Sequence, residues 1–119
     1  MKVLIIDDER LIRMALSRIF NKRGHTVFEA EDGVQGLNLW KQNKPDLVLL
    51  DWIMPNMNGN QLLVKLDKDH MGAVVHVMSA YTNETNMDQL KDLGVASFIS
   101  KPFDNVLDIV INIEGTIGK

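Results

Sequence analysis

Short apolar runs alternate with amphipathic segments along the chain. The apolar runs have the length of strands, and the amphipathic segments carry apolar residues at helical spacing. The pattern therefore predicts five β-α units in one α/β domain. The predicted strands cover residues 3–6, 26–29, 46–50, 74–78 and 96–99. The predicted helices lie near residues 10–22, 33–42, 60–68 and 84–93, and after residue 104.

Consecutive β-α units with right-handed crossovers build a parallel sheet. The run 46–50 is apolar without alternation, which is typical of a strand with helices over both faces. We expect a three-layer, doubly wound (βα)5 sandwich, whose parallel five-stranded sheet has the strand order 2-1-3-4-5. The first and third strands then flank the point where the chain reverses direction, and ligands bind at such a point. Gly36 is expected to weaken the second helix by about 1 kcal/mol relative to alanine.

Polar residues follow four of the apolar runs. Asp7 and Asp8 come after the first run, Asp51 after the third and Ser79 after the fourth, while Lys101 lies just beyond the fifth. The carboxyl ends of parallel strands meet at one edge of a sheet. We therefore expect these five side chains to form a single site.

The chemistry of such a site follows from its charges. Three neighbouring carboxylates repel one another, so at least one should have a raised pKa unless a cation is bound. Mg²⁺ meets this need, because it prefers one or two carboxylates, a carbonyl oxygen and water. No histidine falls within the cluster, which argues against zinc. A carboxylate beside a metal, a lysine and a hydroxyl is suited to nucleophilic phosphoryl transfer.

Taken singly, each of these residues also has a structural explanation. Asp7 or Asp8 can cap the first helix, and Asp51 can be an ordinary turn residue. Ser79 and Lys101 can likewise be structural or solvated. A charge that ends a buried strand needs a partner, however, and Lys101 is the available partner. The shared placement at strand ends therefore favours a functional site.

Composition narrows the class of protein further. The length of 119 residues predicts one domain over residues 1–119. A net charge of -3 offers no broad basic surface, so we expect no direct binding of nucleic acid. There is no cysteine, which excludes disulfides and thiol nucleophiles. No apolar run reaches the roughly 20 residues of a membrane helix, and no signal peptide is evident, so a cytoplasmic protein without membrane insertion is expected.

Four segments together carry a specific set of motifs, namely LIIDDE (4–9), DLVLLDWIMPNMNG (46–59), VVHVMSA (74–80) and FISKPF (98–103). With these motifs the chain resembles the receiver domains of two-component response regulators over essentially its full length. The resemblance extends to chemotaxis regulators and to single-domain phosphorelay proteins. It implies a flavodoxin-like fold with the strand order stated above.

The resemblance also implies roles for the residues at the strand ends. Asp51 is expected to accept a phosphoryl group from the phosphohistidine of a histidine kinase. Asp8 is expected to bind Mg²⁺ directly and Asp7 to bind it through water, while the backbone carbonyl of Ile53 completes the protein ligands. Lys101 is the expected phosphate-binding lysine.

Two further positions match the part of the family pattern that changes on phosphorylation. Ser79 corresponds to the switch hydroxyl and Phe98 to the switch aromatic. The bond between Lys101 and Pro102 is expected to be cis, as in such domains. Phosphorylation is then expected to reshape the surface of the fourth helix, fifth strand and fifth helix.

The function implied is a phosphorylation-dependent switch that catalyses its own modification and slow dephosphorylation but is not a turnover enzyme. Its expected partners are a sensor histidine kinase or histidine phosphotransfer protein, and a downstream protein or output domain; a phosphorylation-dependent dimer is possible. One alternative is a Mg²⁺-dependent phosphatase with an aspartyl-phosphate intermediate, which the absence of a long insertion for a substrate cap disfavours. Another is a receiver-like binding module without phosphorylation, which the presence of all five site side chains disfavours.

Overall fold

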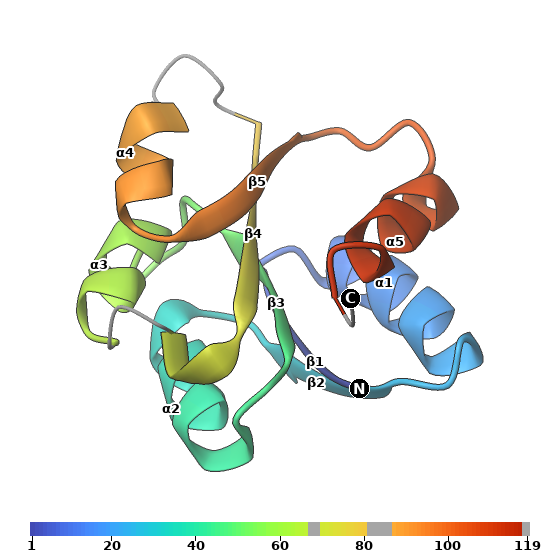
Figure 1. Ribbon diagram of the computed structural model, residues 1–119, viewed down its shortest axis with the longest axis horizontal. Coiled ribbons are helices and arrows are strands. Elements are labelled where there is room, and N and C mark those ends of the chain that lie inside the picture. Colours follow the sequence, from blue (N-terminus) through green and yellow to red (C-terminus); the bar gives the residue numbers. More distant parts are fainter. Residues whose placement is uncertain (67–69, 81–86, 118–119) are drawn as a thin grey trace.

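A single parallel sheet in the order β2-β1-β3-β4-β5 forms the centre of the molecule, as predicted (Figure 1). The computed structural model describes residues 1–66, 70–80 and 87–117. The strands are β1 (Lys2–Ile6), β2 (Thr26–Ala30), β3 (Leu47–Asp51), β4 (Val74–Ser79) and β5 (Val95–Ser100). The helices are α1 (Arg10–Lys22), α2 (Gly33–Asn43), α3 (Gly59–Val64), α4 (Met87–Asp92) and α5 (Val106–Glu114), with a short 3₁₀ turn, η1, at His70–Gly72.

Helices cover both faces of the sheet, which gives the three layers that the pattern predicts. Alternate residues of the central strands point to opposite faces, because side chains alternate along a strand. One set packs under α1 and α5 around Leu16, Phe20 and Val110. The other set packs under α2, α3 and α4, with Trp40 fully buried among it. Figure 1 shows α1 and α5 on one side of the sheet and the other three helices opposite.

Most predicted elements are confirmed, with bounds shifted by one or two residues. The third helix differs more, because it ends at Val64 instead of near residue 68. Beyond Val64 the backbone bonds from Lys65 and Leu66 reach back only three residues, so the α-helical pattern does not continue. The start predicted for the fourth helix lies outside the described residues. In the described part of the chain, no helix is both long and apolar enough to cross a bilayer.

Two helix starts show the capping chemistry that their sequences suggest. The side chain of Asp32 accepts a hydrogen bond from the Gln35 backbone N–H at the start of α2, at 2.8 Å. At α3, the side chain of Asn58 and that of Gln61 each bond to the other's backbone N–H, forming a capping box. These caps fix where each helix leaves the loop that precedes it.

The register of the strands places their polar ends side by side. Ile6 of β1 lies opposite Leu50 of β3, so the next residues, Asp7 and Asp51, are neighbours across the sheet. At the far side, the backbone N–H of Lys101 donates to the carbonyl of Ser79 at 2.9 Å. The peptide bond between Lys101 and Pro102 is cis, as predicted. The carboxyl edge of the sheet therefore collects residues from four strands.

Gly36 of α2 has a packing role that its helix propensity does not reveal. A Cβ added there would lie 2.6 Å from Ile6 Cδ1 and 3.0 Å from Ile6 Cγ1 and Cγ2. Ile6 is fully buried in the middle of the sheet and has little room to move. The glycine therefore lets α2 lie close against β1.

We predict that Gly36→Ala destabilises the protein by roughly 1–2 kcal/mol, because overpacking outweighs the gain in helix propensity. Asn38→Ala is the matched control, since Asn38 is exposed on the same helix. That change should stabilise the protein by a few tenths of a kcal/mol. Urea unfolding of both variants measures the difference, and an equal gain in stability for both would show that the contact with Ile6 is unimportant.

Candidate functional site

The structure brings the five polar residues at the strand ends together, and four of them line one cavity, whereas Asp7 is buried beside it. Asp7 follows β1, Asp51 and Ser79 are the last residues of β3 and β4, and Lys101 follows β5. The cavity has a volume of about 230 Å³. It is lined by Asp8, Glu9, Asp51, Ile53, Ser79, Ala80 and Lys101.

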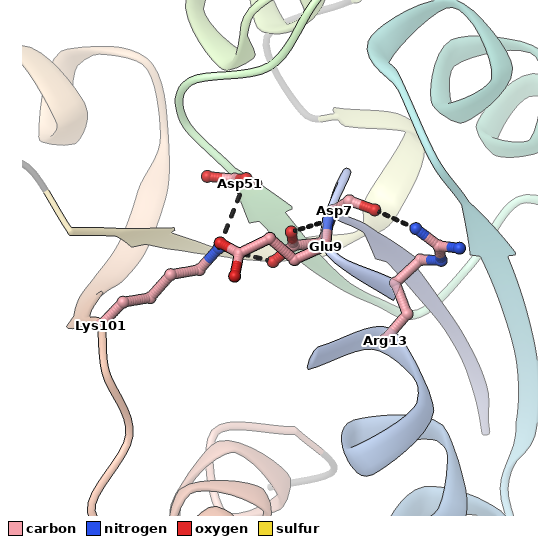
Figure 2. A network of polar contacts seen from close by, with 5 residues as sticks. All are labelled: Asp7, Glu9, Arg13, Asp51 and Lys101. Carbon is pink, nitrogen blue, oxygen red and sulfur yellow. Dashed lines mark hydrogen bonds and ion pairs between the residues drawn. The ribbon is translucent and has the colours of Figure 1, made fainter. Parts of the chain in front are cut away.

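Lys101 reaches from β5 across the sheet edge to three carboxylates (Figure 2). Its Nζ lies 2.7 Å from Asp7 Oδ2, 3.1 Å from Glu9 Oε1 and 3.4 Å from Asp51 Oδ2. The lysine side chain is only 6% exposed, so its charge has little access to water. A buried ammonium needs such partners, because desolvating an unpaired charge costs several kcal/mol.

Asp7 is a fixed member of the cluster and not a helix cap. Its backbone N–H donates to the carbonyl of Ala30, and its Oδ1 accepts from the backbone N–H of Glu9 at 2.8 Å. With Oδ2 bound to Lys101, both carboxylate oxygens have a partner. The N-cap of α1 is Glu9, which makes no side-chain capping bond. The structural explanation of Asp7 or Asp8 as a cap is therefore wrong.

The acidic side chains of this site divide into a buried pair and an exposed pair. Asp7 and Asp51 are buried, whereas Asp8 and Glu9 are exposed. All four contribute carboxylate oxygens that lie within 4.8 Å of one another. Such a set of hard oxygen donors fits a cation like Mg²⁺, with Asp8 on the solvent side where a hydrated ion can approach.

Burial and mutual repulsion shift the pKa values of these groups. Burial raises the pKa of Asp51 to about 8, with the charge of Asp7 adding to the effect and Lys101 opposing it. Burial also raises the pKa of Asp7, although its hydrogen bond to Lys101 partly offsets this. Burial disfavours the Lys101 ammonium, but its bonds and charge interactions with Asp7 and Asp51 outweigh burial and raise its pKa. Four carboxylates thus share one lysine, and burial disfavours the ionised form of the two inner ones, Asp7 and Asp51.

Ile53 lies in the turn between β3 and α3, which is held by backbone bonds. The N–H of Trp52 donates to the carbonyl of Met78 at 3.0 Å, and that of Gly59 to the carbonyl of Trp52 at 2.9 Å. Gly59 must be a glycine here, because a Cβ would lie 2.5 Å from the Trp52 ring. These bonds and this contact hold Trp52, the residue before Ile53, and Ile53 itself lines the cavity.

The predicted switch residues lie on the two strands next to each other at the sheet edge. Ser79 is 2% exposed at the end of β4, and Phe98 is half-buried on β5 opposite Val77. Phe98 packs against the core under α2, α3 and α4. It also borders a second cavity, of about 440 Å³, between β5 and α5.

Two residues of the cluster were not identified from the sequence. Glu9 binds Lys101, and Arg13 of α1 donates from Nη1 to the carbonyl of Asp7 at 2.6 Å. Glu9 could have been identified from the run Asp7-Asp8-Glu9, because three consecutive acidic residues after a strand lie in one turn. A lone arginine in a helix offers no comparable signal.

Comparisons with known proteins agree with this geometry. The family model of the response regulator receiver domain matches residues 3–111. Sporulation initiation phosphotransferase F of Bacillus subtilis is 38% identical over 103 residues, which is 87% of this chain and 83% of that protein. The chemotaxis protein CheY of the same organism is 34% identical over 112 residues, which is 92% of this chain and 93% of that protein.

A solved structure shows the same likeness in three dimensions. The CheY-like receiver domain protein from Methanospirillum hungatei JF-1 superposes with a TM-score of 0.87 at 27% identity. The match covers 97% of this chain and 91% of that one. Together with the strand order and the acidic cluster, these matches show that the chain belongs to the receiver domain family of two-component response regulators and is a phosphorylation-dependent signalling switch.

Proposed function

We propose that Asp51 accepts a phosphoryl group from a phosphohistidine and that this modification sets the state of the switch. The position of the Asp51 carboxylate is the observation that carries the proposal. It is buried at the end of β3, lines the 230 Å³ cavity, and has Lys101 Nζ at 3.4 Å. Phosphoryl transfer needs a placed nucleophile and placed positive charge, and this arrangement supplies both.

The proposed step forms one bond and breaks one bond. A carboxylate oxygen of Asp51 bonds to phosphorus while the P–N bond of the phosphohistidine breaks. The electron pair of that bond returns to the imidazole, which leaves neutral because its other nitrogen already carries a proton. Lys101 then neutralises charge on the phosphoryl oxygens, and the Ser79 hydroxyl donates a hydrogen bond to one of them.

The residues proposed to hold Mg²⁺ all offer oxygen atoms at the carboxyl edge of the sheet. They are Asp8 and Asp51 directly, the backbone carbonyl of Ile53, and Asp7 through water. A bound Mg²⁺ supplies the positive charge that four crowded carboxylates lack and that phosphoryl oxygens require. The raised pKa of Asp51 is consistent with this assignment, because burial and then the nearby charge of Asp7 disfavour its ionised form, and a bound cation would favour that form.

Phe98 is the proposed link between the phosphorylated site and the surface. When the Ser79 hydroxyl moves toward the phosphoryl group, space opens beside β4 and the Phe98 ring can turn inward. The backbone bond from Lys101 to the carbonyl of Ser79 joins the ends of the two strands, so they respond together. The surface of α4, β5 and α5 is then the part that a partner distinguishes.

Several further assignments belong to the same proposal. Residues 1–119 act as one receiver domain, which catalyses its own phosphorylation and slow dephosphorylation but does not turn over a substrate. Its phosphodonor is a sensor histidine kinase or a histidine phosphotransfer protein, and its target is a protein or output domain. Phosphorylation-dependent dimerisation and a cytoplasmic location stay predictions.

Incubation with Mg²⁺ and a small phosphodonor should add one phosphoryl group to the intact protein, as measured by mass spectrometry. Asp51→Asn should abolish this gain, because the amide is not a nucleophile toward phosphorus. Asp46→Asn is the matched control, since Asp46 precedes the opposite end of the same strand. A mass gain that persists in Asp51→Asn would show that another residue accepts the phosphoryl group. Continuous phosphate release from varied substrates would favour the phosphatase alternative.

Asp51→Asn should also change how stability depends on pH in the metal-free protein. The pKa of Asp51 is about 8 in the folded chain, against an ordinary value of 3.8. Between these values the folded chain binds a proton that the unfolded chain releases, so stability falls as pH rises through this window. The variant removes that slope, and at about pH 8.5 it should be more stable than the parent by on the order of 2 kcal/mol.

This effect is measured by urea unfolding in chelator at about pH 5 and about pH 8.5. The advantage of Asp51→Asn should be distinctly larger at the higher pH. Asp92→Asn, which alters an exposed carboxylate on α4, should show no such difference. An equal effect of Asp51→Asn at both pH values would contradict the raised pKa.

Phe98→Ala should leave phosphorylation of Asp51 intact but weaken its effect on the distant surface. Backbone amide NMR shifts, recorded with and without phosphodonor, measure this directly. We expect shifts around Ser79 to persist and those along α5 to shrink at least twofold. Phe28→Ala is the matched control, because Phe28 is half-buried against the same core on the opposite edge strand. A full response of α5 in Phe98→Ala would exclude Phe98 as the link.

A further inference from the structure

Arg13 lies behind the acidic cluster, on the side of Asp7 away from Lys101 (Figure 2). Its Nη1 donates to the backbone carbonyl of Asp7 at 2.6 Å. Its side chain is only 13% exposed. A positive charge in the first turns of a helix opposes the helix dipole, so α1 does not itself favour an arginine at this position. The contacts of the guanidinium explain its placement.

The Asp7 carbonyl is a backbone acceptor just past the end of β1, where the ladder between strands stops. Without a donor, a buried carbonyl loses the hydrogen bond that it makes to water in the unfolded chain. Arg13 supplies that donor. The main chain of Asp7 is thus held at its carbonyl by Arg13 and at its N–H by Ala30, while Lys101 holds the carboxylate.

The arginine is itself anchored outside the helix. Its Nε lies 3.6 Å from Glu29 Oε1 on β2, one residue before Ala30. A planar guanidinium can bond to a carbonyl with one nitrogen and pair with a carboxylate through another, which an ammonium on a flexible stem does less well. The turn between β1 and α1 is therefore tied to β2 through one side chain.

We propose that Arg13 is a positioning residue for the metal site, acting through the main chain of Asp7. This inference rests on the proposed function, in which Asp7 and Asp8 help to hold Mg²⁺. By fixing the turn, Arg13 keeps both carboxylates facing Asp51 before the ion arrives. Residues that orient metal ligands in this way are commonly worth 10–100-fold in metal affinity.

Electrostatics alone makes the opposite prediction, and this separates the two explanations. Arg13 carries a positive charge near the cation site, so its removal should strengthen Mg²⁺ binding if charge were all that mattered. If positioning dominates, Arg13→Gln should weaken binding by roughly tenfold or more. Arg13→Lys keeps the positive charge but lacks the planar guanidinium that bonds to both the Asp7 carbonyl and Glu29, so it should weaken Mg²⁺ binding as well.

Titration of the folded protein with Mg²⁺ alone, followed by the fluorescence of Trp52 beside Asp51, tests this inference. Arg18→Gln is the matched control, because Arg18 is an exposed arginine of the same helix. Unfolding in the presence of a chelator establishes that each variant is folded.

The outcomes are distinct. Weaker binding in both Arg13→Gln and Arg13→Lys, with Arg18→Gln unchanged, supports the inference. Unchanged or tighter binding in Arg13→Gln overturns it, as does wild-type affinity in Arg13→Lys. If Arg13→Gln does not fold, Arg13→Lys decides by the same criterion. Failure of the unmodified protein to bind Mg²⁺ would instead overturn the proposed function.

Discussion

The buried ammonium of Lys101 among three carboxylates is the interaction on which the rest of the site depends. It joins β5 to the ends of β1 and β3 across the carboxyl edge of the sheet. Lys101 faces four crowded carboxylates, and burial together with the charge of Asp7 raises the pKa of Asp51 to about 8. That crowding costs stability, but it prepares the edge for a divalent cation and for a phosphoryl group that brings oxygens able to bind Lys101.

The fold holds the residues of this charged cluster in place through bonds from several elements. Asp7 is bonded through its main chain and both carboxylate oxygens, whereas Asp8 stays exposed beside it. The two adjacent aspartates therefore differ, because Asp7 is buried and held by several bonds whereas Asp8 faces solvent. On the other side, the bond between Lys101 and Ser79 makes the ends of β4 and β5 one unit. A displacement of Lys101 or Ser79 at the acidic cluster can therefore reach Phe98, which lies on β5.

Much of this arrangement could be predicted from sequence, because the carboxyl ends of parallel strands lie at the same edge of the sheet whichever side chains they carry. The closeness of Asp51 and Lys101 could be predicted for that reason. Arg13 was missed because its role depends on where a long side chain points, which periodicity does not encode. The packing role of Gly36 was missed for a similar reason: its cost to the helix can be read from local sequence, whereas its close approach to Ile6 depends on how the helix packs on the sheet. The end of α3 at Val64 depends likewise on tertiary context.

The central claim is that the phosphoryl group is carried by one particular carboxylate. Reductive trapping tests it most directly, because borohydride converts an aspartyl phosphate into homoserine at the modified position. After treatment with phosphodonor and Mg²⁺, peptide mapping should find homoserine at residue 51 and aspartate at residues 7 and 8. Homoserine at residue 7 or 8, or none in a protein that has gained a phosphoryl group, would contradict the account.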